Sequence, residues 1–240
     1  MQIIQLQDYD AMSRKAAALI AAQIDWKPKS VLGLLTGSTP IGTYEHLVEW
    51  HRAGELDFSQ VKTFNLDEYV GLAPEHEQSY CYFMRRHLLD HINIPPENVH
   101  LLNGLATDIA AECAGYDAAI ATCGGIDLLF LGLGRNGHIG FNEPAEVFTK
   151  GTNKATLAQS SLEANKRFFP REDMPRFALT MGIGNIFSAR KILLAVSGAG
   201  KAQIVKQAVH GPITPDVPAS ILQLHPDAIL LGDAAALSLL

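Results

Sequence analysis

The chain has 240 residues, 48% of them hydrophobic, and is therefore long enough to enclose a large apolar core. Its 19 basic and 25 acidic residues give a net charge of −6, which argues against nucleic-acid binding, because such a surface needs clustered lysine and arginine. No stretch approaches the roughly 18 apolar residues of a membrane span.

The N-terminus and the cysteines indicate the compartment. The first ten residues lack the basic and apolar regions of a signal peptide. Cys81, Cys113 and Cys123 are odd in number and show no CxxC spacing, which is typical of reduced thiols. We therefore expect a cytoplasmic protein with no membrane association.

The first predicted unit is a helix at 10–23, a strand at 30–35 and a second helix from 40 to about 53. Pro40 suits the first helical position, and Ser38 or Thr39 suits the cap. The turn between strand and helix, Thr36-Gly37-Ser38, would direct free N–H groups and a helix dipole at an anion. An ordinary strand–helix turn is the alternative.

A second strand, at 61–65, leads into two adjacent carboxylates, Asp67 and Glu68. Because α/β proteins bind ligands at the carboxyl ends of their strands, these side chains are site candidates. Crowding and burial raise the pKa of a carboxyl group, so that it can act as a base. The alternative is that Asp67 caps a following helix.

A helix is predicted at 79–91, where His87 and His91 have the spacing of a metal-binding helix. The metalloprotease motif requires glutamate where Leu88 stands, so we predict no metal site. A short strand at 98–101 and a helix at 109–121 follow.

The apolar run at 126–131 predicts a buried strand, and four glycines follow it within nine residues. Asn136, His138 and Glu143 lie in this glycine-rich segment. Histidine exchanges protons near neutral pH, and a nearby carboxylate can fix its tautomer and stabilise its cation. A surface turn with a solvated histidine is the alternative.

The polar stretch at about 146–176 is predicted to form a lid over the site, with Arg167 beside two phenylalanines as a cation on an apolar anchor. Strands are predicted at 177–180, 192–196 and 228–231, and a helix at 202–209. Between the last two strands, Ser197-Gly-Ala-Gly-Lys201 forms another turn suited to an anion. It is not a Walker A loop, which has glycine and Ser/Thr where Ala195 and Ala202 stand.

About seven strands alternating with helices predict one α/β domain over 1–240, with a doubly wound, mostly parallel, Rossmann-like sheet. Apart from Arg167 in the predicted lid, the candidates follow predicted strands: Thr36 to Thr39, Asp67, Asn136 to Glu143 and Ser197 to Lys201. The candidates should therefore meet at one edge of the sheet, at its topological switch point.

Five segments together resemble the glucosamine-6-phosphate deaminases of the glucosamine/galactosamine-6-phosphate isomerase family. They are LLTGSTPIGTY (34–44), FNLDEYVGL (64–72), GLGRNGHIGFNEPA (132–145), NKRFF (165–169) and SGAGKA (197–202). The related 6-phosphogluconolactonases typically continue after the Gly-His pair with Thr-Ala-Ser, whereas Ile-Gly-Phe-Asn-Glu-Pro stands here.

The resemblance implies an enzyme of amino-sugar catabolism, of hydrolase/isomerase (aldose–ketose) type and without metal or organic cofactor. It would convert D-glucosamine 6-phosphate and water to D-fructose 6-phosphate and ammonia. Asp67 would move a proton between C2 and C1, while His138 and Glu143, supported by Asn136, would assist ring opening. The implied substrate-binding residues are Thr36, Gly37, Ser38, Gly137, Arg167 and Lys201.

The sequence also departs from the family pattern. Many longer members carry aspartate at position 136, and an asparagine there cannot stabilise a histidine cation by charge. Longer, hexameric members are activated by N-acetylglucosamine 6-phosphate at a site that the resemblance places just after Ala145, where Glu146 would repel a phosphate. We therefore expect no allosteric effector, and the oligomeric state, monomer or homo-oligomer, stays open.

Two alternative functions remain at this stage. One is a 6-phosphogluconolactonase-like hydrolase or another sugar-phosphate isomerase on the same fold. The other is a non-catalytic sugar-phosphate sensor, of the kind that usually follows a DNA-binding helix-turn-helix. No room for such a motif is expected before Ser30, and the joint presence of Asp67, His138 and Glu143 favours an enzyme.

Overall fold

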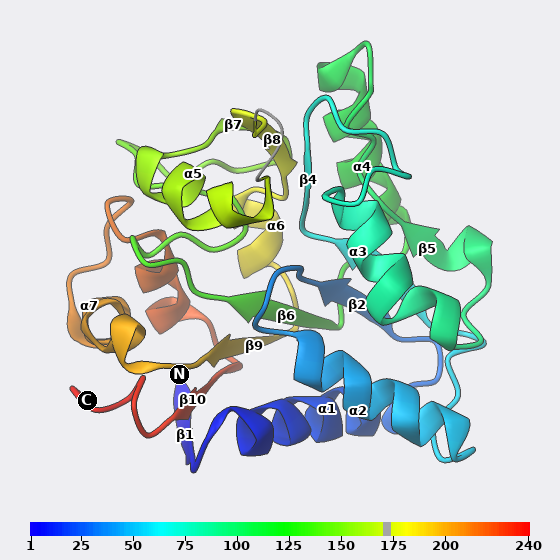
Figure 1. The fold of residues 1–240 in the computed structure, drawn as a ribbon, viewed down its shortest axis with the longest axis horizontal. Coiled ribbons are helices and arrows are strands. Elements are labelled where there is room, and N and C mark those ends of the chain that lie inside the picture. The colour runs from blue at the N-terminus through cyan, green and yellow to red at the C-terminus, as the bar shows by residue number, and fades with distance from the viewer. Residues whose placement is uncertain (170–173) are drawn as a thin grey trace.

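The computed structural model describes residues 1–169 and 174–240, apart from the side chains of Ala164 and Arg167. Its centre is a seven-stranded sheet in which every pair of neighbours is parallel (Figure 1). The strands, in spatial order, are β1 (Gln2–Leu6), β10 (Ala228–Asp233), β9 (Lys191–Val196), β6 (Leu128–Gly132), β2 (Val31–Leu34), β3 (Lys62–Asn65) and β5 (Val99–His100). The predicted α/β fold with a parallel sheet is confirmed.

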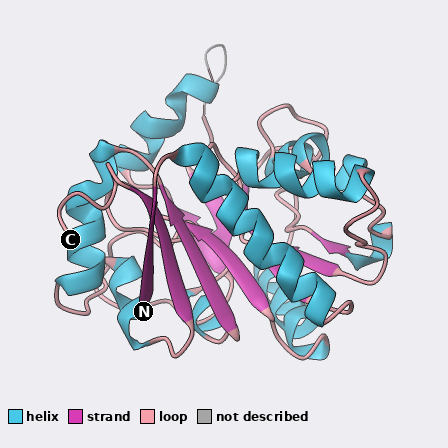
Figure 2. Ribbon diagram, turned by 90° about the horizontal axis from the view of Figure 1, so that it is seen from below, coloured by secondary structure: helices cyan, strands magenta, loops and turns pink. Residues whose placement is uncertain are grey.

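The central strands are buried on both faces, as their unbroken apolar runs predict. In β6, the four residues from Leu128 to Leu131 have no exposed surface. This strand pairs with β2 on one side and with β9 on the other. Burial on both sides requires helices over both faces, and Figure 2 shows them there.

The described part of the chain contains the helices α1 (Tyr9–Trp26), α2 (Ile41–Arg52), α3 (Tyr80–His87), α4 (Ile109–Thr122), α5 (Gln159–Asn165), α6 (Ile183–Phe187) and α7 (Ala202–His210). The 3-10 segments are η1 (Leu89–His91), η2 (Pro96–Asn98), η3 (Lys166–Phe168), η4 (Ala199–Lys201) and η5 (Pro218–Leu224). Among these, α1 contacts α2, which contacts α3, while α6 and α7 both contact η5 and α5 contacts η3.

A second, antiparallel sheet lies above the first, with the order β4 (Asp67–Tyr69), β8 (Phe177–Thr180) and β7 (Asn153–Thr156). This sheet corrects one prediction. The strand at 177–180 exists but does not join the main sheet, where the unpredicted β1 supplies the seventh strand. A short apolar run identifies a strand without identifying its partner, and β1 is half-exposed at the sheet edge and lacks such a run.

Two predicted helix details are wrong. The helix at 79–91 ends at His87, because Leu88 leaves the helical conformation, so His87 and His91 do not share one helix. The second helix starts at Ile41 after Pro40, and no side chain caps it. Instead, the hydroxyl of Tyr9 donates to the carbonyls of residues 38 and 39 and accepts from the N–H of residue 42. A tertiary contact from α1 thus replaces the local cap.

The segment predicted as a lid contains β7, α5 and η3. A small apolar cluster holds it, consisting of Tyr69, Phe141, Leu157, Phe169 and Ala178. Phe169 is 4% exposed and is the expected apolar anchor, whereas Phe168 is 39% exposed. Residues 170–173 of this segment lie outside the described residues.

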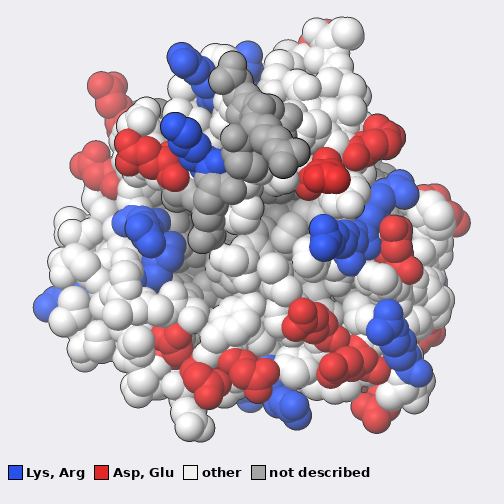
Figure 3. All heavy atoms as spheres, in the orientation of Figure 1, with Lys and Arg blue, Asp and Glu red and all other residues white. Residues whose placement is uncertain are grey.

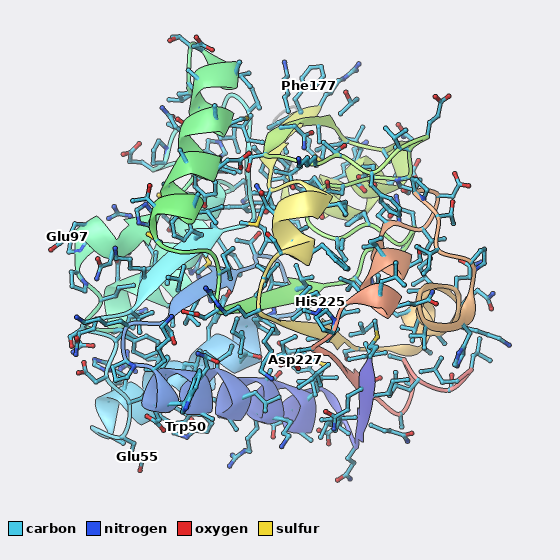
Figure 4. All side chains as sticks on the ribbon, turned by 180° about the vertical axis from the view of Figure 1, so that it is seen from behind. Trp50, Glu55, Glu97, Phe177, His225 and Asp227 are labelled. Carbon is cyan, nitrogen blue, oxygen red and sulfur yellow. The ribbon has the colours of Figure 1, made fainter. Side chains whose placement is uncertain are left out.

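The amino edge of the main sheet is closed by structural contacts. The Lys191 ammonium lies 2.6 Å from the Asp227 carboxylate, and the His225 ring contacts the Ala189 carbonyl at 2.8 Å. Figure 4 shows His225 and Asp227 at this edge, just before β10. The ligand-binding side must therefore be sought at the opposite, carboxyl edge.

No helix in the described part of the chain is long and apolar enough to cross a membrane. The described lysine and arginine side chains on the face shown in Figure 3 are interspersed with aspartate and glutamate, and they form no continuous basic surface. Within 1–169 and 174–240, no group of three or more His, Cys, Asp or Glu side chains could hold a metal ion.

Candidate active site

A cleft of about 1090 Å³ opens at the carboxyl edge of the main sheet. Its walls come from the segments that follow β2, β3, β6 and β9, together with α5 and the start of α1. The strands β2 and β6 are neighbours, yet the chain leads from β2 to β3 on one side and from β6 to β9 on the other. The cleft therefore lies at the topological switch point, as predicted.

The turn after β2 forms one wall of the cleft through Thr36, Gly37, Ser38 and Thr39. Gly37 has φ of +96°, a conformation that glycine adopts without the strain of a side chain. The Tyr44 hydroxyl donates to the Leu35 carbonyl at 2.6 Å, which fixes the start of the turn. The predicted anion turn is thus held at its start and faces the cleft.

Asp67 lines the cleft at the start of β4 and is 8% exposed. Burial, followed by the neighbouring charge of Glu68, raises the pKa of Asp67 to about 8. The Glu68 carboxylate is held by the N–H groups of Tyr69, Tyr80 and Cys81 at 2.8 to 2.9 Å. Asp67 is not a helix cap here, since it lies within a strand, and it has the strength of a general base.

His138 also lines the cleft, and the Glu143 carboxylate lies behind it. The His138 Nδ1 is 3.1 Å from the Glu143 Oε2, and the Asn136 amide donates to the same oxygen at 2.7 Å. The backbone N–H of His138 donates to the Asn136 Oδ1 at 3.2 Å. The three residues of the glycine-rich loop therefore form one hydrogen-bonded unit with the imidazole toward the cleft.

The electrostatics of Glu143 favour its charged form. Burial raises the pKa of this carboxyl, but hydrogen bonds from His138, Ser161 and Asn136 and the charge of the imidazole outweigh that effect and lower it to about 2. A carboxylate beside Nδ1 orients the ring and stabilises an imidazolium. His138 can therefore transfer protons through its other nitrogen.

Lys201, at the end of η4, faces the cleft from the side of β9. Its ammonium donates to the Leu133 carbonyl. Burial, with a smaller contribution from the charge of Arg135, lowers the pKa of Lys201 to about 8. Arg135 also lines the cleft, so two cations lie close enough to repel each other, an arrangement that an anion would relieve.

The second predicted anion turn, at 197–201, is held by hydrogen bonds to β10. The Ser197 hydroxyl donates to the Asp233 carboxylate at 2.5 Å, and the Gly198 N–H donates to it at 2.9 Å. These groups are therefore engaged with β10, and Lys201 is the clearest donor that this turn offers to the cleft.

Two predicted site residues stand apart from the others. Gly137 is not a lining residue; a side chain there would meet Val217 and Ile204, and its φ is +89°. The Arg167 side chain lies outside the described residues. The remaining predicted residues line the cleft or, in the case of Glu143, lie directly behind the histidine.

Sequence reasoning missed several residues of the cleft, namely Tyr9, Tyr80, Arg135, Ser160, Ser161, Asn165 and Phe168. Arg135 carries a signal that could have found it, since it is a cation inside the glycine-rich segment. Tyr9 and Ser161 carry none, because they reach the site from segments with no recognisable motif.

The comparison with known families is decisive for the class of protein. Residues 7–230 match the family described as glucosamine-6-phosphate isomerases/6-phosphogluconolactonase. The chain belongs to this family. The glucosamine-6-phosphate isomerase/6-phosphogluconolactonase family thus includes both the deaminases that the motifs resemble and the lactonases kept as an alternative.

Within the family, two similar relatives are named glucosamine-6-phosphate deaminases. The glucosamine-6-phosphate deaminase of Lachnoclostridium phytofermentans is 55% identical over 232 residues, covering 96% of this chain and 98% of the relative. That of Clostridioides difficile is 54% identical over 239 residues, covering 99% and 96%.

Among the solved structures, that of a deaminase is also more similar to this chain than that of a lactonase. A structure described as a monomeric glucosamine-6-phosphate deaminase has a TM-score of 0.97 at 43% identity and covers 100% of both chains. The 6-phosphogluconolactonase of Trypanosoma cruzi has a TM-score of 0.79 at 17% identity, covering 99% of this chain and 96% of its own, and shows a shared fold.

Proposed function

We propose that this chain is a glucosamine-6-phosphate deaminase, which converts D-glucosamine 6-phosphate and water to D-fructose 6-phosphate and ammonia. The observation that carries the proposal is a buried carboxyl of raised pKa, Asp67, in the same cleft as a carboxylate-paired histidine. The relatives at 54% and 55% identity support the same substrate. Both the isomerisation and the loss of ammonia need proton transfers next to a carbonyl or imine carbon, which these groups can supply.

The phosphate would bind between the turn after β2 and the cations of the opposite wall. Thr36 and Ser38 offer hydroxyls and backbone N–H groups there, and Lys201 offers an ammonium. Charge-assisted hydrogen bonds to a dianion are stronger than neutral ones and fix the position of the sugar. Arg167 stays a predicted second cation of this site.

Ring opening would be the task of His138 and Glu143. Imidazole can take the proton of the anomeric hydroxyl and return one to the ring oxygen, which yields the open-chain aldehyde. Glu143 would hold the ring in the required tautomer and stabilise the imidazolium while it carries the proton. Asn136 would orient the same carboxylate oxygen.

Isomerisation would follow at C2 and C1. Asp67, as carboxylate, would remove the C2 proton, which the neighbouring aldehyde makes acidic, while the aldehyde oxygen takes up a proton from solvent to give a C1–C2 enolamine. Asp67 would then return its proton to C1, and the amine nitrogen would release one to solvent. The resulting imine at C2 adds water and releases ammonia, leaving D-fructose 6-phosphate. A base whose pKa lies near the working pH is suited to both the removal and the return of the proton.

The segment at about 146–176 is proposed as the cover of the cleft, since Ser160, Ser161, Asn165 and Phe168 line it from that side. In its described part, Leu157 and Phe169 belong to the small apolar cluster, while Phe148 packs against the main core. That this segment moves during turnover stays a prediction.

The proposal is tested by offering two substrates to the same preparation. With D-glucosamine 6-phosphate, we expect ammonia and D-fructose 6-phosphate in equal amounts. With 6-phosphogluconolactone, we expect no hydrolysis above the spontaneous rate. Lactone hydrolysis without ammonia release would instead place the chain with the lactonases of its family.

A further inference from the structure

Ser161, in the first turn of α5, reaches the proposed ring-opening pair from outside the glycine-rich loop. It is 3% exposed, and its hydroxyl donates to the Glu143 Oε1 at 2.5 Å. The same hydroxyl lies 3.4 Å from the His138 Nδ1. A serine hydroxyl has one proton, so the short contact with the carboxylate is the one that it donates.

The two oxygens of Glu143 are held by different parts of the chain. Oε2 contacts Asn136 and His138 of its own loop. Oε1 accepts from Ser161 and, at 3.3 Å, from the N–H of Ala158. The terminal torsion of a glutamate is broad, so contacts to one oxygen alone leave the plane of the carboxylate poorly fixed. The contacts from residues 158 and 161 supply the second point of attachment.

We propose that Ser161 is a positioning residue of this site, whose hydroxyl fixes the Glu143 carboxylate so that its other oxygen faces His138. The inference rests on the proposed function, because it assigns Ser161 to the ring-opening pair. Both donors to Oε1 come from the start of α5. The alignment of Glu143 with His138 therefore depends on the position of this helix.

If Ser161 has only a structural role, a different result of its substitution is expected. If the hydroxyl only anchored α5, its loss would act in the same way as any weakening of that helix. Gln159 provides the comparison, because its exposed side chain donates to Glu163 on the same helix at 3.0 Å and does not line the cleft. The variant Gln159→Ala removes this contact within α5 and leaves the contacts of Glu143 in place.

The kinetic test compares Ser161→Ala, Ser161→Thr and Gln159→Ala on D-glucosamine 6-phosphate. Loss of a hydrogen bond to a charged group corresponds to a roughly ten- to hundredfold change in an equilibrium or rate constant. We therefore expect S161A to lower kcat by about this factor and to leave KM within about threefold of the wild-type value. S161T keeps the hydroxyl and should recover most of kcat, while Q159A should match the wild type. If S161A does not fold, Ser161→Cys, a similar volume with a weak donor, replaces it.

A second readout does not depend on turnover. The carboxyl carbon of Glu143 is titrated by NMR in the free enzyme and assigned with Glu143→Gln. Because the Ser161 hydroxyl stabilises the charged form, its loss should move the titration midpoint of Glu143 upward by about one pH unit, and Q159A should not move it. The shift of the Glu143 midpoint in S161A is expected even if the substrate of the wild type proves to be another sugar phosphate.

The inference is overturned if S161A leaves the Glu143 midpoint in place. It is also overturned if S161A and Q159A lower kcat equally. A wild type that releases no ammonia, combined with a shifted midpoint in S161A, would reject the proposed function and keep the positioning of Glu143 by Ser161.

Discussion

At the scale of single residues, burial decides the chemistry of the cleft. Asp67 and Lys201 have pKa values displaced toward each other, one raised and one lowered, each to about 8. Burial is the first cause in both cases, because it disfavours a charge of either sign. A site that binds an anion needs a cation, here Lys201. A site that removes a proton needs a base that can change its protonation state, here Asp67.

The raised pKa of Asp67 predicts a cost in stability. In the unfolded chain the carboxyl loses its proton near pH 3.8, while the folded chain keeps it to about pH 8. Between these values the native state binds more protons, so this group makes the free energy of unfolding fall as pH rises. Asp67→Asn cannot titrate. We expect its stability advantage over the wild type to grow by up to about 1.4 kcal/mol per pH unit between pH 5 and 7.

Urea unfolding of both proteins at several pH values measures this difference. A difference in the free energy of unfolding that does not change from pH 5 to pH 7 would show that the Asp67 carboxyl titrates normally.

The lowered pKa of Lys201 predicts the pH dependence of substrate binding. As pH rises through about 8, the ammonium loses its charge, and KM of the wild type should rise by up to about tenfold between pH 7 and 9. Lys201→Arg keeps its charge over this range. Its KM should start higher, because the fit is altered, and should rise less.

The ionisation of the substrate is common to both enzymes, so the ratio of KM at pH 9 to KM at pH 7 isolates residue 201. Equal ratios for the two proteins would remove Lys201 from phosphate binding.

Only some of the site residues could be predicted from the sequence. Asp67, His138 and Glu143 were predictable because carboxylates and a histidine follow apolar strands, and the structure brings them to one cleft or directly behind its wall. Ser161 and Tyr9 were not predictable, because serine and tyrosine are common in surface segments. Their roles arise from contacts that span 18 and 29 residues of chain.

At the scale of elements, the glycine-rich loop shows a close approach that only glycine permits. A methyl group at Gly134 would overlap the imidazole of His138. Gly134→Ala should therefore displace the ring and lower kcat by at least roughly tenfold, with KM for the phosphate-bearing substrate within about threefold, since one misplaced proton-transfer group has this size of effect.

Gly115→Ala is the matched control, because a side chain at this helical position meets no atom within 4 Å. It should keep full activity and gain up to about 1 kcal/mol in the free energy of unfolding. Full activity in G134A would show that the ring position is unimportant.

The elements also show why part of the fold escaped prediction. Strands β2, β6 and β9 are apolar runs with a glycine turn after them, so both their type and their place were readable. β1 has mostly exposed or half-exposed residues, and β8 pairs with β4 and β7 in a sheet that the alternation of strands and helices does not imply. Pairing partners are set by tertiary contacts, and local pattern does not carry them.

At the scale of the whole molecule, the surroundings of Glu143 bear on regulation. Behind this residue lies a cavity of about 190 Å³, which Val147, Asn153 and Thr156 help to line. Glu143 is the only charged residue lining it in the described part of the chain, and Glu146 nearby is exposed. An acidic effector would meet like charge there, with no cation among the described lining residues.

We therefore predict hyperbolic kinetics toward D-glucosamine 6-phosphate that N-acetylglucosamine 6-phosphate does not change. Allosteric control would require a second site with unequal affinity for two states. Initial rates with and without the acetylated sugar measure this directly. A sigmoidal curve that becomes hyperbolic on its addition would reveal such a site.

The central claim is that Asp67 carries the proton transfer of a deaminase in this cleft. The most direct measurement is the rate of ammonia and D-fructose 6-phosphate formation from D-glucosamine 6-phosphate by the wild type and by Asp67→Asn, with substrate affinity measured by calorimetry. We expect equimolar products from the wild type, and in D67N a loss of kcat of at least about a thousandfold with affinity nearly unchanged, because the base acts in the transition state. A D67N enzyme with near-normal kcat would contradict the account.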